Sequence, residues 1–194
     1  MRQHIAGVDE AGRGPLAGPV VVAAVVLDPQ RPIAGLADSK KLSAARRDAL
    51  ALEIKTHARF AVVEVDAATI DRMNILAATL HGMRLAVEAL DPLPSEAWID
   101  GNRLPQNMPC ASTAFVKGDA LHACISAASI LAKTHRDALM RRYAEQFPGY
   151  GFADHMGYPT SEHLAALKKL GPSAIHRLSF RPVRELVDGD LWLA

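Results

Sequence analysis

The feature that most restricts the fold of this 194-residue sequence is an unbroken apolar run at residues 19–27, PVVVAAVVL. A short, continuous, valine-rich run of this kind is typical of a buried β-strand. The alternating segment HIAGVD at residues 4–9 predicts a second strand just before it. Because only a short Gly- and Pro-containing segment separates the two, we expect them to be antiparallel neighbours in a central sheet.

The remaining pattern predicts a mixed α/β fold in which helices flank that sheet. Residues 119–147 contain neither glycine nor proline and predict one long helix. Its buried face should carry Ile125, Ala128, Ala132 and Leu139. The other expected strands are 60–66, 97–100 and 112–116, and the other expected helices are 43–58, 74–90 and 160–170, the first of them capped by Ser43.

Length and composition predict one soluble globular domain, since 194 residues with 49% hydrophobic and 22% charged residues can bury a sizeable core. No apolar run approaches the roughly 20 residues that span a bilayer. The start, MRQHIAGVDE, does not resemble a signal peptide. Two cysteines do not make a disulfide framework, so we expect a reducing compartment and a cytoplasmic location.

The charge is distributed unevenly although the net value is only +1, from 22 basic minus 21 acidic residues. Residues 1–100 hold 11 Lys/Arg and 13 Asp/Glu, a net of −2, whereas residues 101–194 hold 11 and 8, a net of +3. A bias of this size usually marks a solvated face, and it permits a polyanionic partner without requiring one. The late basic residues are Lys133, Arg136, Arg141, Arg142, Lys168, Lys169, Arg177, Arg181 and Arg184.

The stretch GVDEAGRGPLAGPV, between the first two strands, contains three glycines in the pattern G-x-G-x-x-x-G, at Gly12, Gly14 and Gly18. It lacks the spacing of a dinucleotide fingerprint and the G-K-[ST] of a P-loop, and a strand follows it instead of a helix. Glycines can still expose backbone N–H groups, and Arg13 between two of them can reach a phosphate. The residues alone favour a simpler interpretation, a tight hairpin with a surface arginine.

Four acids stand at or near the ends of predicted elements: Asp9, Glu10, Asp100 and Asp119. Each has a structural explanation of its own, since Asp100-Gly101 is a common turn and Asp119 could cap the helix that follows. If the four converge, each like-charged pair about 4 Å apart costs on the order of 4 kcal/mol. Such a cluster is then protonated or holds cations, and oxygen ligands favour Mg²⁺ or Mn²⁺.

Seven segments, in one order and spread from Gly7 to about Arg184, make the chain resemble bacterial ribonuclease HII. The resemblance implies a ribonuclease H-like fold with a central mixed sheet, flanking helices and a helical C-terminal part. It implies hydrolysis of the RNA strand of RNA–DNA hybrids and cleavage 5′ of a ribonucleotide embedded in duplex DNA, leaving 5′-phosphate and 3′-hydroxyl ends. The segments are GVDEAGRGPLAGPVV, DSKKLS, IDGN, VKGDA, ISAASILAK, HMGYPTSEHL and GPSAIHRLSF.

The same resemblance implies roles for individual residues. Asp9, Glu10, Asp100 and Asp119 match the family's catalytic tetrad, which holds two divalent ions, Mn²⁺ or Mg²⁺. Two such ions about 3.5–4 Å apart can clamp the attacking and leaving oxygens of a phosphodiester.

Contacts to the nucleic acid are expected from three places in the chain. Gly12-Arg13-Gly14 matches the motif that senses the 2′-hydroxyl at the RNA–DNA junction. Tyr158 matches the tyrosine that contacts the deoxyribose beyond it, although an isolated tyrosine is usually a packing residue. Ser39 and Lys40 are candidates for phosphate contacts, although a lysine pair such as Lys40-Lys41 is more often a solvated helix entry.

Two other functions are open at this point, a different metal-dependent enzyme such as a nucleotide hydrolase and a non-catalytic nucleic-acid-binding module. The absence of a P-loop disfavours the first, and a pure binder gains nothing from carboxylates that face phosphate. The histidines and cysteines lack zinc spacing, and no G-x-S-x-G motif is present. We therefore expect a monomeric endonuclease, one catalytic domain over residues 1–194, helical from about residue 158.

Overall fold

The computed structural model describes residues 4–37, 39 and 42–190, and the sheet in this part of the chain has five strands in the order β3-β2-β1-β4-β5. β1 pairs with β2, and β2 with β3, in antiparallel fashion, whereas β1–β4 and β4–β5 are parallel. The predicted antiparallel pair is thereby confirmed, with Gly7 opposite Val25. The strands are β1 (Ile5–Ala11), β2 (Val20–Val26), β3 (Arg59–Val65), β4 (Glu96–Asp100) and β5 (Ala111–Phe115).

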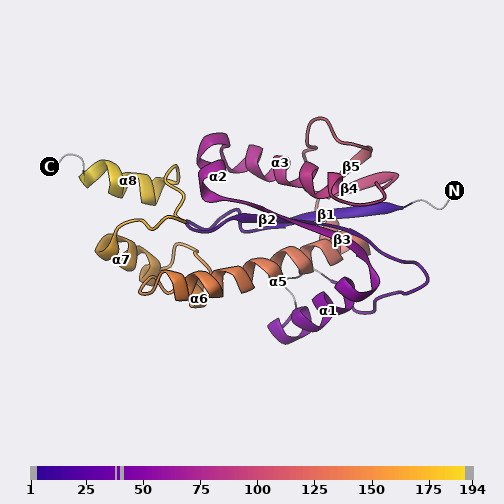
Figure 1. The fold of residues 1–194 in the computed structure, drawn as a ribbon, viewed down its shortest axis with the longest axis horizontal. Coiled ribbons are helices and arrows are strands. Elements are labelled where there is room, and N and C mark those ends of the chain that lie inside the picture. The colour runs from indigo at the N-terminus through magenta and orange to yellow at the C-terminus, as the bar shows by residue number, and fades with distance from the viewer. Residues whose placement is uncertain (1–3, 38, 40–41, 191–194) are drawn as a thin grey trace.

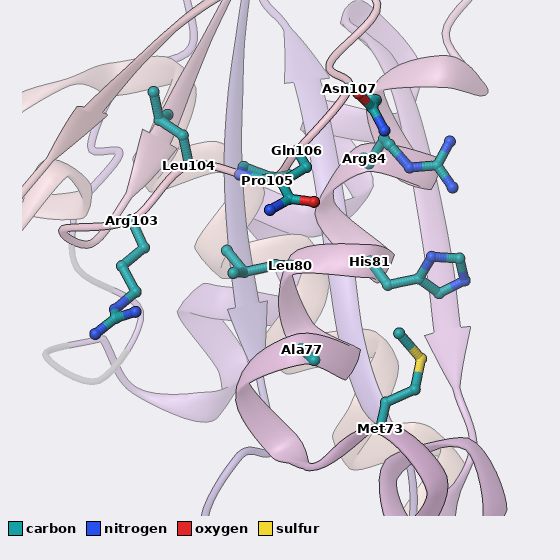
Figure 2. Close-up of a pocket in the computed structure, with 10 residues that line it drawn as sticks. All are labelled: Met73, Ala77, Leu80, His81, Arg84, Arg103, Leu104, Pro105, Gln106 and Asn107. Carbon is teal, nitrogen blue, oxygen red and sulfur yellow. The ribbon is translucent and has the colours of Figure 1, made fainter.

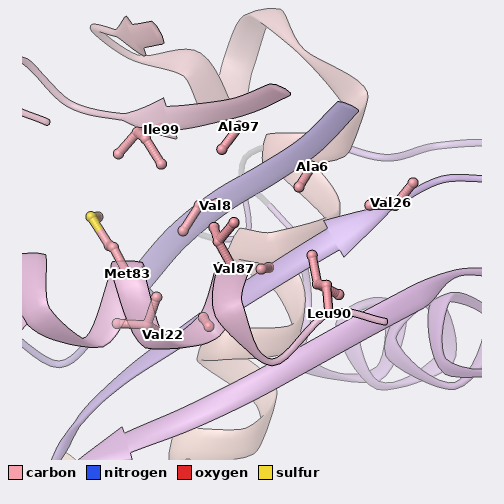
Figure 3. Close-up of a cluster of buried hydrophobic side chains, with 11 residues drawn as sticks. Ala6, Val8, Val22, Val26, Met83, Val87, Leu90, Ala97 and Ile99 are labelled. Carbon is pink, nitrogen blue, oxygen red and sulfur yellow. The ribbon is translucent and has the colours of Figure 1, made fainter. Parts of the chain in front are cut away.

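Helices cover both faces of this sheet (Figure 1). α3 (Ile75–Glu88) packs on one face, where Met83 and Val87 meet Val8 and Val22 (Figure 3). α5 (Ala123–Gln146) and α1 (Ala44–His57) cover the other face. β2 is buried along its whole length, as its sequence predicts, and each fully buried valine contributes roughly 1.5–3 kcal/mol.

Short side-chain caps set the helix boundaries. Ser43 caps α1 by accepting from the backbone N–H of Arg46, as expected. Asp66 caps α2 (Ala67–Met73), and Asn74 both ends α2 and caps α3. α2 was not predicted from the sequence, because its cap directly follows the last residue of a strand.

The single helix expected over residues 119–147 is wrong. The chain forms a short helix, α4 (Gly118–Leu121), then breaks at His122, whose backbone is extended, and starts again as α5. Asp119 therefore lies inside α4 and does not cap a long helix. The predicted buried face is confirmed, since Ile125, Ala128, Ala132 and Leu139 are all buried.

The described C-terminal part holds three further helices. The segment between the last two, residues 171–180, contacts residues 12–18, which we call the glycine loop. Arg177 N donates to Leu16 O at 2.8 Å, and Gly18 N donates to Ile175 O at 2.9 Å. No helix in the described part of the chain is long and apolar enough to cross a bilayer. The three helices are α6 (Phe152–His155), α7 (Ser161–Leu170) and α8 (Arg181–Asp190).

Candidate active site

All four predicted acids line one cavity of about 670 Å³. β1 and β4 are parallel neighbours, so their carboxyl ends meet at one edge of the sheet, and the α4 turn brings the fourth acid to the same edge. The cavity therefore joins residues that are more than 100 positions apart in the sequence. Its lining is Asp9, Glu10, Ala11, Gly12, Arg13, Gly14, Ser39, Ile75, Asp100, Asp119, Ser129, Lys133, Arg136 and Tyr158.

Asp9 and Glu10 lie inside β1, which continues to Ala11, so the expectation that the strand ends at Asp9 is wrong. Neighbouring side chains on a strand face opposite ways, yet both acids reach the cavity. The reason is the ladder with β4, which ends at the pair Val8 and Ile99. Beyond that pair the edge of β1 opens into the cavity, and side chains from either face can turn into it.

Burial and like charge act together on the first two acids. Asp9 is only 5% exposed, and its pKa is raised well above the ordinary value, first by burial and then by the charges of Glu10 and Asp100. Burial also raises the pKa of Glu10, which Arg13 partly offsets from 3.4 Å away. Glu10 Oε2 is buried and makes no hydrogen bond within the described residues. Arg13 is thus a nearby cation for Glu10, and Glu10 Oε2 is the oxygen left without a hydrogen-bond donor among the described residues.

The α4 turn holds the other two acids together. Gly118 N donates to Asp100 Oδ1 at 2.7 Å, and Asp119 N points to the same oxygen at 3.4 Å. The left-handed backbone of Lys117 starts this turn, and the Ser126 hydroxyl donates to the carbonyl of Asp119. Asp100 thus orders the α4 turn, which carries Asp119.

The four carboxylates suit a hard divalent cation by chemistry. All the atoms that they offer to a metal are oxygens. Burial, followed by neighbouring negative charge, raises the pKa of Asp9 and Glu10. The buried Glu10 Oε2 has no hydrogen-bond donor among the described residues. As they stand, the described residues include no group of three or more His, Cys, Asp or Glu side chains that could hold a metal ion. The fit therefore rests on charge and donor type, in a cavity that all four line.

Two buried arginines fix the glycine loop, and this corrects the interpretation of the late basic residues as a solvated face. Arg177 is 0% exposed and donates to Gly12 O at 2.6 Å, Arg13 O at 2.9 Å and Gly18 O at 3.0 Å. Desolvation lowers its pKa to about 9. Its guanidinium donates to backbone carbonyls, and these hydrogen bonds anchor the loop that carries Arg13.

Arg136, on α5, likewise anchors the loop by hydrogen bonds to backbone carbonyls, at residues 17 and 19. It is 1% exposed and donates to Ala17 O and Pro19 O, both at 3.1 Å, and to Met156 O at 3.0 Å. Burial lowers its pKa to about 10. The sequence does carry a signal for this burial, because helical spacing puts Arg136 four residues after Ala132 and three before Leu139.

The expected nucleic-acid contacts have different surroundings. The Tyr158 ring is 44% exposed and lies beside Gly14, where an added Cβ would meet it at 3.4 Å. Ser39 is buried in the cavity wall, its hydroxyl 2.8 Å from that of Ser129. Lys40 lies outside the described residues. Lys133 also lines the cavity and forms an ion pair with Asp137 at 2.6 Å. The sequence did not single out Lys133 as a residue of the site.

A second cavity, of about 610 Å³, lies between α3 and residues 103–107 (Figure 2). Its lining includes His81, Arg84 and Arg103, and the ten described residues around it contain no carboxylate. It therefore lacks the groups that would hold a divalent cation, and we assign catalysis to the acidic cavity.

Comparison with known proteins identifies the family to which the chain is similar. The family model described as Ribonuclease HII matches residues 6–183. A protein named Ribonuclease HII from Azoarcus sp. (strain BH72) is 58% identical, over 97% of this chain and 93% of its own. One from Maricaulis maris (strain MCS10) is 55% identical, over 95% and 85%. The crystal structure of ribonuclease H2 from Pyrococcus horikoshii OT3 superposes with a TM-score of 0.79 at 27% identity, covering 96% of this chain and 98% of that one.

Proposed function

The chain belongs to the ribonuclease HII family, nucleases that hydrolyse the RNA strand of RNA–DNA hybrids, and from this premise we propose that it also cuts duplex DNA 5′ of a single embedded ribonucleotide. The products carry 5′-phosphate and 3′-hydroxyl ends. One observation carries the proposal: the four carboxylates, the glycine loop and Tyr158 line a single cavity. The same cavity can then contact the scissile phosphate and the sugar next to it at the same time.

Asp9, Glu10, Asp100 and Asp119 would hold the divalent ions on which this family depends, either Mg²⁺ or Mn²⁺. When bound at these four carboxylates, two such ions would activate water and offset negative charge at the phosphate. The protein contributes a desolvated pair, Asp9 and Glu10, whose pKa values are raised first by burial and then by neighbouring carboxylates, an effect that Arg13 partly offsets at Glu10. It also contributes Asp100, which fixes the loop carrying Asp119 through the N–H of Gly118.

Recognition of the ribonucleotide belongs to Gly12-Arg13-Gly14. Arg177 donates to the carbonyls of Gly12 and Arg13, so the loop is anchored from the protein side without help from the substrate. Gly14 is exposed beside the cavity and lets the backbone approach the 2′-hydroxyl, the group that distinguishes RNA from DNA. Tyr158, across from Gly14, packs on the deoxyribose of the adjoining nucleotide.

We assign all of these functions to one monomeric catalytic domain. Support for a single domain comes from the C-terminal helices, where Val183 of α8 and Leu167 of α7 share a buried cluster with Leu16 of the glycine loop. The C-terminal part is thus packed on the segment that reads the ribonucleotide.

The deciding experiment is a cleavage assay on duplex DNA with one ribonucleotide, beside an all-DNA duplex, with Mg²⁺, with Mn²⁺ and with EDTA. We expect a single cut 5′ of the ribonucleotide, only with metal and only in the first duplex. Cleavage of a long hybrid without cleavage of the embedded ribonucleotide would refute the proposed substrate range while keeping the family's activity.

A second assay tests the recognition residue. Tyr158→Ala should weaken cleavage at the embedded ribonucleotide more than cleavage within a long hybrid, because only the former presents a deoxyribose next to the ribose. Equal losses on the two substrates would remove the role assigned to Tyr158.

A further inference from the structure

A chain of two histidines stands directly behind Tyr158. His163, on α7, points Nδ1 at the carbonyl oxygen of Tyr158, 2.9 Å away, and its Nε2 lies 3.1 Å from Nε2 of His176. His176 in turn accepts from the backbone N–H of Ser173 at 2.9 Å through Nδ1. The contacts therefore run without a gap from the 173–176 turn to the backbone of the recognition tyrosine.

The backbone at both ends sets the direction of this chain. Ser173 N–H can only donate, so Nδ1 of His176 accepts and its proton is on Nε2. That proton is donated to Nε2 of His163, which leaves the His163 proton on Nδ1, facing the Tyr158 carbonyl, a pure acceptor. Both rings are neutral in this arrangement, each in a single tautomer. A second proton on either ring would set two N–H groups against each other.

The surroundings keep both rings neutral and fixed. His163 is 0% and His176 2% exposed, and both pack against the Phe152 ring. Burial is the main reason that the pKa of His163 is lowered and that of His176 falls to about 4.

Few other titratable groups face the pair. His155, on α6, stacks on His163 with ring centroids 4.5 Å apart, and Tyr150 lies against His176 at 5.1 Å while its hydroxyl donates to Gly171 O. His155 itself accepts from Gly157 N through Nδ1. Glu162, on the first turn of α7, is exposed.

We propose that His163 and His176 are positioning residues that fix Tyr158 for recognition of the ribonucleotide junction. The inference rests on the proposed function of Tyr158 and adds the device that holds it. Other contacts already anchor the two preceding residues, since Leu16 N donates to Gly157 O at 2.8 Å and Arg136 donates to Met156 O. At Tyr158 itself, the two contacts to the carbonyl come from Thr160 N at 2.8 Å and from His163.

The test is a double-mutant cycle between His163 and Tyr158 on the duplex with one ribonucleotide. His163→Leu should lower kcat/KM about fivefold, the order of one hydrogen bond, and should do so with little change on a long hybrid. In a Tyr158→Ala background the same change should have no further effect. A loss of equal size in both backgrounds, or on both substrates, would reduce His163 to a packing residue.

A conservative variant separates positioning from folding. The side-chain amide nitrogen of asparagine is as many bonds from Cα as His163 Nδ1, so His163→Asn can still donate to the Tyr158 carbonyl. We expect it to recover most of the junction cleavage that His163→Leu loses. If both variants lose the same activity while both stay folded by circular dichroism, the hydrogen bond is not what positions Tyr158.

The controls keep two failures apart. His81→Asn, in the second cavity, should behave as wild type on both substrates. If the wild-type protein cuts long hybrids but not the embedded ribonucleotide, the proposed function fails. If the wild type cuts both and Tyr158→Ala is selective but His163→Leu is not, only the present inference fails.

Discussion

Nη2 of Arg177 donates to the carbonyl oxygen of Gly12 at 2.6 Å, across 165 positions of sequence. The arginine is fully buried and its other donors also end on backbone carbonyls of the glycine loop. A guanidinium is suited to this task because its planar fork can engage several carbonyls in one geometry. The conformation of the glycine loop therefore depends on the hydrogen bonds of Arg177, a residue that does not line the cavity.

Arg177→Met tests that dependence, since it keeps most of the length of the side chain and removes all its donors. Three loop carbonyls are left without a partner, and we expect the free energy of unfolding to fall by about 2–4 kcal/mol. For a chain of this size that lowers Tm by roughly 5–15 °C. Cleavage at an embedded ribonucleotide should fall with it at a temperature where the variant is folded. Arg184→Met, an exposed change on α8, is the matched control and should leave both measurements unaltered.

Asp9→Asn should abolish metal-dependent cleavage, by at least about a hundredfold, because it removes a charged ligand. Its effect on stability has the opposite sign. The raised pKa of Asp9 means that the folded protein holds this proton more tightly than the unfolded chain, so its carboxylate destabilises the metal-free fold as pH rises above 3.8.

Urea unfolding in EDTA at pH 7 should therefore show Asp9→Asn to be at least as stable as wild type. Added Mn²⁺ should then stabilise the wild type and not the variant. Asp48→Asn, exposed on α1, should gain as much from Mn²⁺ as wild type does. A destabilised Asp9→Asn protein would mean that the acid is structural.

Gly12 and Gly14 should respond differently to alanine. Gly12 has φ +94°, and a Cβ there would lie 2.0 Å from Arg136 Nε, so Gly12→Ala should destabilise the fold by more than about 1 kcal/mol. At Gly14 the nearest atom is the Tyr158 ring at 3.4 Å, an ordinary contact. Gly14→Ala should therefore keep its Tm and lose junction cleavage. Equal Tm losses in the two variants would show that Gly14 has a structural function only.

His176 should give stability a specific pH dependence. Its pKa is about 4 in the folded protein and near 6.5 when unfolded, so the unfolded chain takes up the proton first as pH falls through this window. Stability from this group is thus complete above about pH 6.5 and has declined by roughly 2 kcal/mol at pH 4.5. The difference in unfolding free energy between wild type and His176→Asn should shrink by that amount between pH 7 and pH 4.5. A difference that does not vary with pH would contradict the assignment of a neutral buried ring.

Much of the fold could be predicted because local pattern and tertiary structure agree. β2 is buried along its length, and residues 19–27 are apolar without interruption. The helix break at His122 could not be predicted, and the α4 turn that precedes it is held by a hydrogen bond from Gly118 to Asp100, a contact 18 positions away. Nothing in the local sequence between Asp119 and Phe147 opposes a continuous helix.

The candidate site divides in the same way. The acids stood out because charged residues that follow apolar strands are unusual, and parallel pairing of β1 with β4 then brought Asp9 and Asp100 to one edge. Arg136 and Arg177 were grouped with surface lysines, since net charge does not distinguish a solvated cation from one bonded to carbonyls. Helical spacing indicates the burial of Arg136, but the partners of both arginines include backbone carbonyls 117 to 165 positions away, which only the folded structure identifies.

The bridge between Ala17 and His176 has a consequence for the order in which the protein is made. A ribosome synthesises the glycine loop early, but its anchors at residues 175–177 emerge only when more than 150 further residues have followed. Contacts of such long sequence separation form late and slowly. We therefore expect a nascent chain to acquire its sheet before residues 12–18 are ordered, so that the cavity is completed only once residues 175–177 have been synthesised.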